Sequence, residues 1–260
     1  MSTPFLKMTG AGNDFLVFDD RKGDCAGASP QRWASLCARR TGVGADGIVL
    51  LCDSERYDFR MVFINADGAE AEMCGNGARC LAWAAAVENG LGREVTIDSP
   101  RPEGWEMPEG IGTKQAWSIS FEARDGRHDG LGWERQAMVS LGSSSDIKDL
   151  TLETDEGVVR GALLHVGVPH FVSLSDDPET VPLDRIGLRL RSHERLGPAG
   201  ANVSYVSEEP DSEGAYHIRT FERGVEAETL SCGTGAAAAA AVLARQGASS
   251  PCRYAAGGGS

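Results

Sequence analysis

Two cysteines in this sequence occupy the same short pattern, a Cys-Gly-x-Gly step that leads into an alanine-rich segment. The patterns span residues 74–77 and 232–235, and their cysteines are Cys74 and Cys232. A cysteine directly before a helix lies where unbonded backbone N–H groups and the positive end of the helix dipole meet, which lowers the pKa of a thiol. The glycines let backbone approach a ligand closely, and the same N–H groups can bind a carboxylate. Each loop therefore offers a proton-transfer group beside an anion site.

Two such thiols on opposite sides of a bound amino acid could remove a Cα proton from one face and return another proton to the opposite face. For one loop alone, a small buried cysteine in a tight turn is an equal alternative, but the duplication favours chemistry. No lysine stands in a recognisable pyridoxal-phosphate context. We therefore predict an isomerase, a racemase or epimerase of a small-molecule amino acid, that uses neither a cofactor nor a metal. The helix N-termini would spread the charge of the carbanionic transition state.

The two cysteine patterns belong to a longer internal repeat at a separation of about 156 residues. Chance similarity in a glycine- and alanine-rich chain is the alternative, but four matches in the same order disfavour it. Besides the cysteine patterns, the matching pairs are 15–20 with 171–177, 44–46 with 200–202, and 68–72 with 224–228. The repeat predicts two similar halves, each carrying one cysteine loop.

Local patterns indicate that both halves mix helices with strands. Pro30 near a first turn with Ser29 as N-cap predicts a helix over 30–39, and alanine-rich sequence predicts helices over 78–88 and 236–245. Apolar, partly β-branched runs predict strands over 14–19, 48–51, 60–65, 95–98, 158–166, 171–174, 201–206 and 215–221. Glycine and proline predict loops over 100–112 and 126–132. We place the domains at 1–135 and 136–260.

Composition narrows the functional classes. The formal charge is −13, from 38 acidic and 25 basic residues, which argues against a nucleic-acid partner. No apolar run reaches the roughly 18 residues of a membrane span, and residues 1–7 lack the pattern of an export signal. The seven cysteines show no disulfide framework, so we expect a cytoplasmic protein with reduced thiols and no membrane partner.

Several blocks of the sequence resemble the diaminopimelate epimerase family. The most specific block is residues 65–80, and the others are residues 7–15, 42–47, 167–170, 200–203, 222–225 and 228–235. The resemblance implies an α/β fold of two pseudo-symmetric halves, each a central helix wrapped by mixed β-strands, with the active-site cleft between them. It also implies a homodimer that interconverts LL- and meso-diaminopimelate in lysine and peptidoglycan precursor biosynthesis.

The resemblance also assigns roles to individual residues. Cys74 and Cys232 match the catalytic acid/base pair. In the family, a carboxylate site is formed at the two helix starts, and its residues correspond here to Gly75, Asn76, Gly233 and Thr234. The residues that hold the substrate's amino and carboxylate groups correspond to Asn13, Asn65, Asn202, Glu222 and Arg223. His170 and Glu222 match residues that support the arrangement of the site. These types suit the task, because a guanidinium binds a carboxylate bidentately and an asparagine amide both donates and accepts.

Two positions depart from the family pattern. Val168 stands where many members carry a substrate-binding Asn, and Gly47 stands where some carry Gln. Both differences remove polar contacts to the distal half of diaminopimelate, so a racemase of another amino acid, such as histidine or proline, is the alternative.

Two further expectations concern other parts of the sequence. A non-catalytic thiol redox or metal-binding module is a remote alternative, because Cys74 and Cys80 lie too far apart for a Cys-x-x-Cys pair. We interpret residues 255–260 as a flexible or truncated end.

Overall fold

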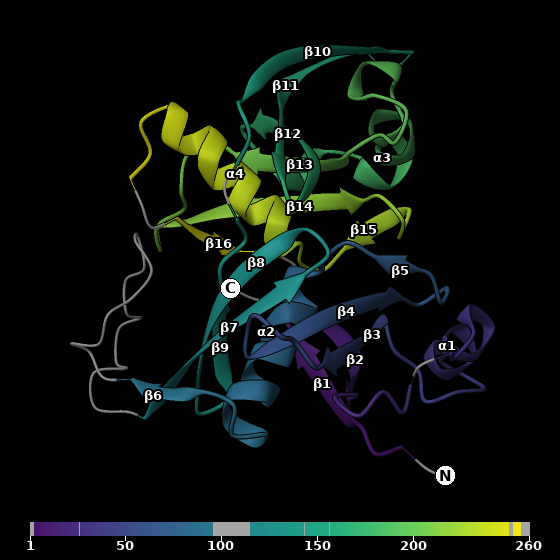
Figure 1. Cartoon of the computed structure of the whole chain (residues 1–260). Coiled ribbons are helices and arrows are strands. Elements are labelled where there is room, and N and C mark those ends of the chain that lie inside the picture. The colour runs from purple at the N-terminus through teal and green to yellow at the C-terminus, as the bar shows by residue number, and fades with distance from the viewer. Residues whose placement is uncertain are drawn as a thin grey trace. The chain divides into compact units, whose positions relative to one another are not determined.

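The computed structural model describes residues 3–25, 27–95, 115–142, 144–155, 157–249 and 252–255. The chain divides into two compact units, Met1–Gly142 and Ser143–Ser260 (Figure 1). The boundary predicted from the sequence, after Arg135, falls at the turn between two strands of the first unit. The predicted loop over 100–112 and residues 256–260 lie outside the described residues.

The first unit is built on a nine-stranded sheet in the order β1-β2-β3-β4-β7-β8-β9, with β5 paired to β4 and β6 to β7. Its strands are β1 Leu6–Gly10, β2 Asn13–Asp19, β3 Gly47–Cys52, β4 Phe59–Asn65, β5 Glu70–Ala71, β6 Arg93–Val95, β7 Ala116–Ala123, β8 Gly126–Trp133 and β9 Gln136–Val139. Its helices are α1 Pro30–Cys37 and α2 Gly75–Trp83, and α2 continues as a π-helical turn, η1 Ala84–Glu88.

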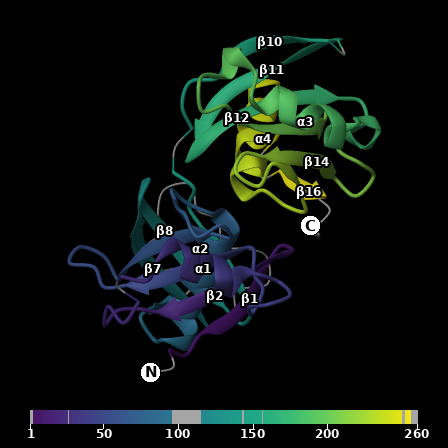
Figure 2. The same ribbon diagram turned by 90° about the vertical axis from the view of Figure 1, so that its right-hand side faces the viewer.

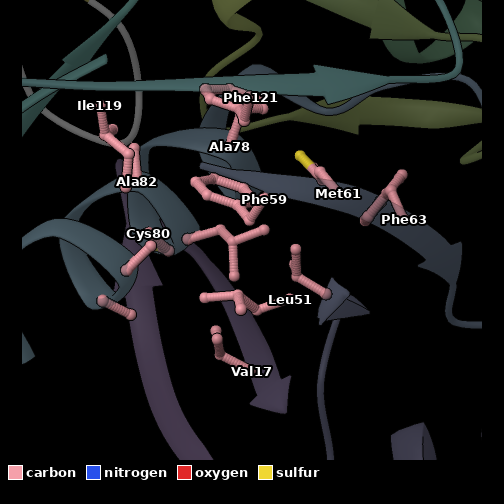
Figure 3. Packing of buried hydrophobic residues seen from close by; sticks show 14 of the residues in the cluster. Val17, Leu51, Phe59, Met61, Phe63, Ala78, Cys80, Ala82, Ile119 and Phe121 are labelled. Carbon is pink, nitrogen blue, oxygen red and sulfur yellow. The ribbon is translucent and has the colours of Figure 1, made fainter. Parts of the chain in front are cut away.

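Helices cover both faces of this sheet. Along β2, Phe15 and Val17 pack into the core beneath α2, whereas the alternate residues Leu16 and Phe18 pack into a second cluster with Trp33 of α1. A strand buried on both faces is apolar throughout, which is why residues 15–18 form a continuous apolar run. Figure 3 shows the α2 core, in which side chains from α2 and from the strands converge.

The second unit has a seven-stranded sheet in the order β10-β11-β12-β13-β14-β15, with β16 paired to β14. Its strands are β10 Lys148–Thr154, β11 Gly157–Val166, β12 Val168–Ser175, β13 Asn202–Ser207, β14 Ala215–Glu222, β15 Ala227–Thr229 and β16 Arg253–Ala255. Its α-helices are α3 Leu183–Arg191 and α4 Gly233–Arg245 (Figure 2), with short 3-10 turns η2 Pro178–Thr180 and η3 Glu194–Leu196.

The two units repeat one pairing scheme. Strands β1 to β5 pair in succession antiparallel, parallel, antiparallel and antiparallel. Strands β11 to β15 pair in the same succession. In both units a helix, α1 or α3, makes the crossover that a parallel pair requires, and a cysteine helix, α2 or α4, follows the last strand. The predicted α/β fold of two pseudo-symmetric halves is confirmed.

One element predicted from the sequence, the loop over residues 126–132, is wrong. Residues 126–132 were expected to form a loop because of their glycines, but they form most of β8, which pairs antiparallel with β7 along its whole length. Two of the glycines, Gly130 and Gly132, are needed for close packing instead. A Cβ atom on Gly130 would lie 3.0 Å from Ile119 Cγ2 and 3.1 Å from Ala82 Cβ, so glycine lets α2 rest directly on this strand.

Candidate active site

Cys74 is the N-cap residue of α2. Its backbone is extended, with φ −129° and ψ 114°, and its side chain makes no cap hydrogen bond to the helix. The Cys74 carbonyl accepts the first helical hydrogen bond, 2.7 Å from Ala78 N. The first turn of a helix presents N–H groups that its own carbonyls do not bond, so the half-buried thiol lies beside a group of donors.

Cys232 has the same place at the start of α4. Its backbone is extended in the same way, with φ −118° and ψ 105°, and its side chain likewise makes no cap hydrogen bond. Its carbonyl accepts from Ala236 N at 2.9 Å. A Cβ on Gly235 would lie 3.1 Å from Ser204 Oγ and 3.2 Å from Cys232 Sγ, so this position requires glycine for the close approach of α4 to β13.

In the first unit, the predicted substrate-binding asparagines lie on the α2 side of the sheet. Asn13 begins β2 and shares the face of Phe15, while Asn65 ends β4 and shares the face of Phe63, and both phenylalanines belong to the α2 core. The β1–β2 turn explains the position of Asn13. Ala11 and Gly12 both have positive φ, 49° and 89°, as a two-residue hairpin turn requires, and Asn13 pairs with Gly10 directly after it.

In the second unit, the predicted polar residues lie on the face that α4 covers. Along β12, β13 and β14 the residues Phe171, Val203 and Phe221 pack into the cluster beneath α3. The neighbouring residue of each strand therefore points to the opposite face, which α4 contacts. Those neighbours are His170, Asn202 and Glu222.

Two residues that were not predicted join the first cysteine loop. Asn76 Nδ2 donates to Asn13 Oδ1 at 2.7 Å, and Asn13 Nδ2 donates to Asp46 Oδ2 at 3.2 Å. Arg79 Nη2 donates to Asn76 Oδ1 at 2.7 Å. Asp46 and Arg79 lie in sequence blocks that we had singled out, but no pattern in the sequence shows which side chain reaches which amide.

The second cysteine loop has a carboxyl group beside its thiol. Glu222 is hydrogen-bonded to Cys232, and its Oε1 accepts from the Thr229 hydroxyl. Burial raises the pKa of Glu222, and the hydrogen bonds from Thr229 and Cys232 oppose the effect without cancelling it. Asn202 Oδ1 accepts from Arg223 N at 2.8 Å, which fixes the chain as it leaves β14. Thr234 Oγ1 lies 3.6 Å from Cys232 Sγ.

His170 is fully buried, and neither ring nitrogen has a hydrogen-bond partner within the described part of the chain. Burial lowers its pKa to about 3, with smaller contributions from His165 and Arg223. The imidazole is therefore neutral at physiological pH.

Four other thiols have a different environment. Burial raises the pKa of Cys25, Cys52 and Cys80 to about 11, and it also raises that of Cys37. Cys80 lies in the α2 core, among the side chains of Figure 3, and is 5% exposed. All seven cysteines are thiols in this structure. Among the described residues, no cluster of three or more His, Cys, Asp or Glu could hold a metal ion, and no helix is long and apolar enough to span a membrane.

Comparison with known proteins places the chain in a family. The family model described as diaminopimelate epimerase matches residues 5–104 and 162–260. The chain belongs to the diaminopimelate epimerase family. A diaminopimelate epimerase of Aquifex aeolicus is 39% identical over 92% of this chain and 80% of its own length. That of Gemmatimonas aurantiaca is 38% identical, over 94% of this chain and 80% of its own length.

Solved structures share the fold of this diaminopimelate epimerase family member at much lower sequence identity. A hydroxyproline epimerase from Agrobacterium vitis aligns with a TM-score of 0.63 and 17% identity, covering 94% of this chain and 78% of its own. A phenazine biosynthesis protein of Bacillus anthracis aligns with a TM-score of 0.58 and 15% identity, covering 94% and 79%. At these identities the likeness concerns the fold alone.

Proposed function

We propose that this protein interconverts LL- and meso-diaminopimelate by two-base proton transfer at Cα, with Cys74 and Cys232 as the two bases. The observation that carries the proposal is the duplicated loop, in which each unit ends a strand, places a cysteine at a helix N-cap and leaves that side chain uninvolved in capping. Membership of the diaminopimelate epimerase family supplies the substrate. This reaction belongs to the biosynthesis of lysine and of peptidoglycan precursors.

The reaction needs one thiolate and one thiol. The thiolate removes the Cα proton, and the electron pair of the C–H bond is left on Cα and its carboxylate. The thiol then gives its proton to the opposite face and becomes the thiolate. A Cα–H next to a carboxylate is a very weak acid, so the N–H groups of Gly75, Asn76, Gly233 and Thr234 at the helix starts must stabilise the developing charge. One turnover therefore exchanges the protonation states of the two cysteines.

Glu222 controls the proton of Cys232 in this scheme. Its carboxyl group is hydrogen-bonded to the thiol, and burial raises the pKa of that carboxyl group. Between turnovers Glu222 would exchange a proton with Cys232, and water would exchange the matching proton with Cys74, which restores the starting pair.

The remaining predicted residues hold the substrate. Asn13 and Asn65 lie on the α2 side of their sheet, and Asn202 lies on the α4 side of its own. Arg223 follows β14 directly and supplies the planar fork that suits the distal carboxylate. We assign His170 a supporting role, because its buried neutral ring fills the space beneath α4 without titrating at physiological pH.

We further infer that the enzyme needs no pyridoxal phosphate, works in the cytoplasm and forms a homodimer. The two thiols perform both proton transfers, and a reducing compartment keeps them active. The family resemblance supports the dimer. Sedimentation velocity at several protein concentrations tests that assembly, and a fully monomeric enzyme with normal turnover would contradict it.

A second substrate class has two observations in its favour. Gly47 has no room for a side chain, because a Cβ would lie 2.7 Å from Phe63 Cε2 and 2.9 Å from the Ile64 carbonyl oxygen. Val168, at the start of β12, is also apolar. A site with fewer polar contacts to a distal group would accept a shorter or less polar amino acid, such as histidine or proline.

A substrate panel separates the two proposals. The purified protein is incubated with LL-diaminopimelate, L-histidine, L-proline and trans-4-hydroxy-L-proline, and the stereoisomers are resolved by chiral chromatography. We expect meso-diaminopimelate to form and the other amino acids to remain unchanged. Racemisation of histidine or proline with inert diaminopimelate would overturn the substrate assignment and leave the two-base chemistry standing.

A further inference from the structure

We propose that Asp46 and Arg79 are positioning residues that fix the orientation of two asparagine amides, Asn13 and Asn76, at the first cysteine loop. The inference rests on the proposed function, because it concerns how that site presents its polar groups to the substrate. Neither residue is part of the cysteine pattern, and each acts through an asparagine.

The four side chains form one continuous line of hydrogen bonds. Arg79 Nη2 donates to Asn76 Oδ1 at 2.7 Å, Asn76 Nδ2 donates to Asn13 Oδ1 at 2.7 Å, and Asn13 Nδ2 donates to Asp46 Oδ2 at 3.2 Å. Asn76 lies in the first turn of α2 and is 2% exposed, so its amide is removed from bulk water. The hydrogen bonds therefore join the start of α2 to Asp46, the residue directly before β3.

The chemical types at the two ends leave only one arrangement of the amides. A carboxylate only accepts, so Asn13 must turn its NH2 group toward Asp46 and its oxygen toward Asn76. Asn76 must then offer its NH2 group to Asn13 and its oxygen to Arg79. A guanidinium only donates, so the arrangement closes without conflict. Without these ends, each amide could rotate by half a turn and offer a donor where the substrate needs an acceptor.

Asp46 is itself held from several sides. Arg39 Nη2 donates to Asp46 Oδ1 at 2.5 Å, and Asp14 N donates to Asp46 Oδ2 at 3.1 Å. The backbone N–H of Asp46 donates to the Asp14 carbonyl at 2.8 Å. Each carboxylate oxygen thus has its own donor in addition to the Asn13 contact, and the carboxylate cannot swing away from the amide without breaking these bonds.

At the other end, Arg79 follows Asn76 by three positions on α2, so both side chains lie on the same side of the helix. Lysine at this position would also only donate, whereas glutamine could present either an oxygen or an NH2 group. The pair of substitutions therefore separates the orientation of the amide from simple loss of a side chain.

The test compares Asp46→Asn and Arg79→Gln with Arg79→Lys and the control Asp19→Asn. Asp19 lies on the same strand as Asn13 and pairs with Arg21, away from the Asn13 amide, so it matches the loss of charge. A wrong amide orientation lowers the fraction of enzyme that can bind substrate. We expect Asp46→Asn and Arg79→Gln to raise KM for diaminopimelate about tenfold, the cost of one hydrogen bond, with kcat changed less than about twofold. Arg79→Lys and Asp19→Asn should keep KM within about twofold of the original.

A measurement without substrate keeps this inference separate from the proposed function. Selective 15N labelling of asparagine allows the side-chain NH2 signals of Asn13 and Asn76 to be followed by NMR, with assignment by Asn13→Asp and Asn76→Asp. We expect both signals to move in Arg79→Gln and to remain in place in Arg79→Lys. Unmoved signals together with an unchanged KM in Asp46→Asn and Arg79→Gln would overturn the inference. An enzyme inactive on diaminopimelate whose amide signals respond as expected would overturn the substrate assignment alone.

Discussion

At the scale of single residues, position distinguishes the two cysteines proposed as bases from the other thiols. Cys25, Cys52 and Cys80 have the same side chain, but burial raises their pKa to about 11, so they stay protonated near neutral pH and offer no thiolate to accept a proton. Cys74 and Cys232 differ because each is the N-cap of a helix. The sequence alone indicates this difference, since only these two cysteines precede a Gly-x-Gly step and an alanine-rich segment.

Replacement of single cysteines tests that assignment. Cys74→Ala and Cys232→Ala should each reduce epimerisation by at least about a thousandfold, because a methyl group transfers no proton. Cys25→Ala is the matched control, since Cys25 is half-buried like the catalytic pair but has a raised pKa, and it should retain normal kcat. Chiral chromatography of the product gives the rates. Near-normal turnover in either of the first two variants would exclude the two-base mechanism.

Arg223 tests the substrate's distal group. Arg223→Lys should lower kcat/KM for diaminopimelate roughly tenfold to a hundredfold, because an ammonium cannot bind a carboxylate with two parallel hydrogen bonds. Arg245→Lys is the control. Arg245 ends α4, at the opposite end of the helix from Cys232, and forms an exposed ion pair with Asp149 of β10. Steady-state kinetics give kcat/KM for both variants. Equal effects in the two variants would show that Arg223 does not bind the substrate.

His170 should make the folded state sensitive to acid. Its pKa is about 3 in the folded chain against 6.5 ordinarily, so between those values the unfolded chain binds the extra proton. The stabilising contribution is thus complete above pH 6.5 and is lost progressively as the pH falls.

Urea unfolding at pH 6.5 and pH 4.5 measures this contribution. We expect the original protein to lose roughly 2–3 kcal/mol more of its free energy of unfolding over this interval than His170→Leu does. Parallel losses in the two proteins would show that His170 is protonated in the folded state.

The polar residues of the site illustrate what sequence can reveal. Asn13, Asn202 and Glu222 stand in distinctive blocks, and the structure places each on the helix-covered face of its strand. Asp46 and Arg79 were missed as participants, because their role depends on hydrogen bonds between β2, the start of β3 and α2. Contacts between residues far apart in the chain leave no local pattern.

At the scale of elements, apolar runs predicted the central strands well, and alanine predicted α4. The β8 segment was misread because Gly130 allows close packing against α2 and does not form a turn. Helix α3 was not predicted, since Arg185 and Gly187 interrupt its apolar spacing. Both cysteine helices begin at the glycine after the cysteine, three residues earlier than expected, so the glycines form the first turn.

Gly187 in α3 provides a test at this scale. An exposed helical Gly→Ala change commonly stabilises a protein by about 1 kcal/mol. Here a Cβ would lie 2.3 Å from Phe221 Cδ2, in a buried ring on the strand that carries Glu222. We expect Gly187→Ala to destabilise the fold by roughly 1–3 kcal/mol through overpacking. Thermal unfolding followed by circular dichroism gives the sign, and a raised melting temperature would refute the packing argument.

At the scale of the whole molecule, one pairing scheme occurs twice and brings one cysteine with each copy. The scheme is carried by strand order and by the α1 and α3 crossovers, whereas the polar residues differ between the copies: amides surround the first loop, and a carboxyl group adjoins the second thiol. Duplication explains why two thiols have equivalent backbone positions. The differences between the copies give the two thiols different polar neighbours.

The central claim is that two different groups remove and return the Cα proton. The most direct measurement is the epimerisation of LL-diaminopimelate in deuterated water, stopped early, with the isotope content of substrate and product determined by proton NMR and mass spectrometry. We predict that the first meso product carries deuterium at the inverted carbon while the remaining LL substrate keeps its proton. Product that retains the original proton, or deuterium that enters the LL substrate as fast as product forms, would contradict the account.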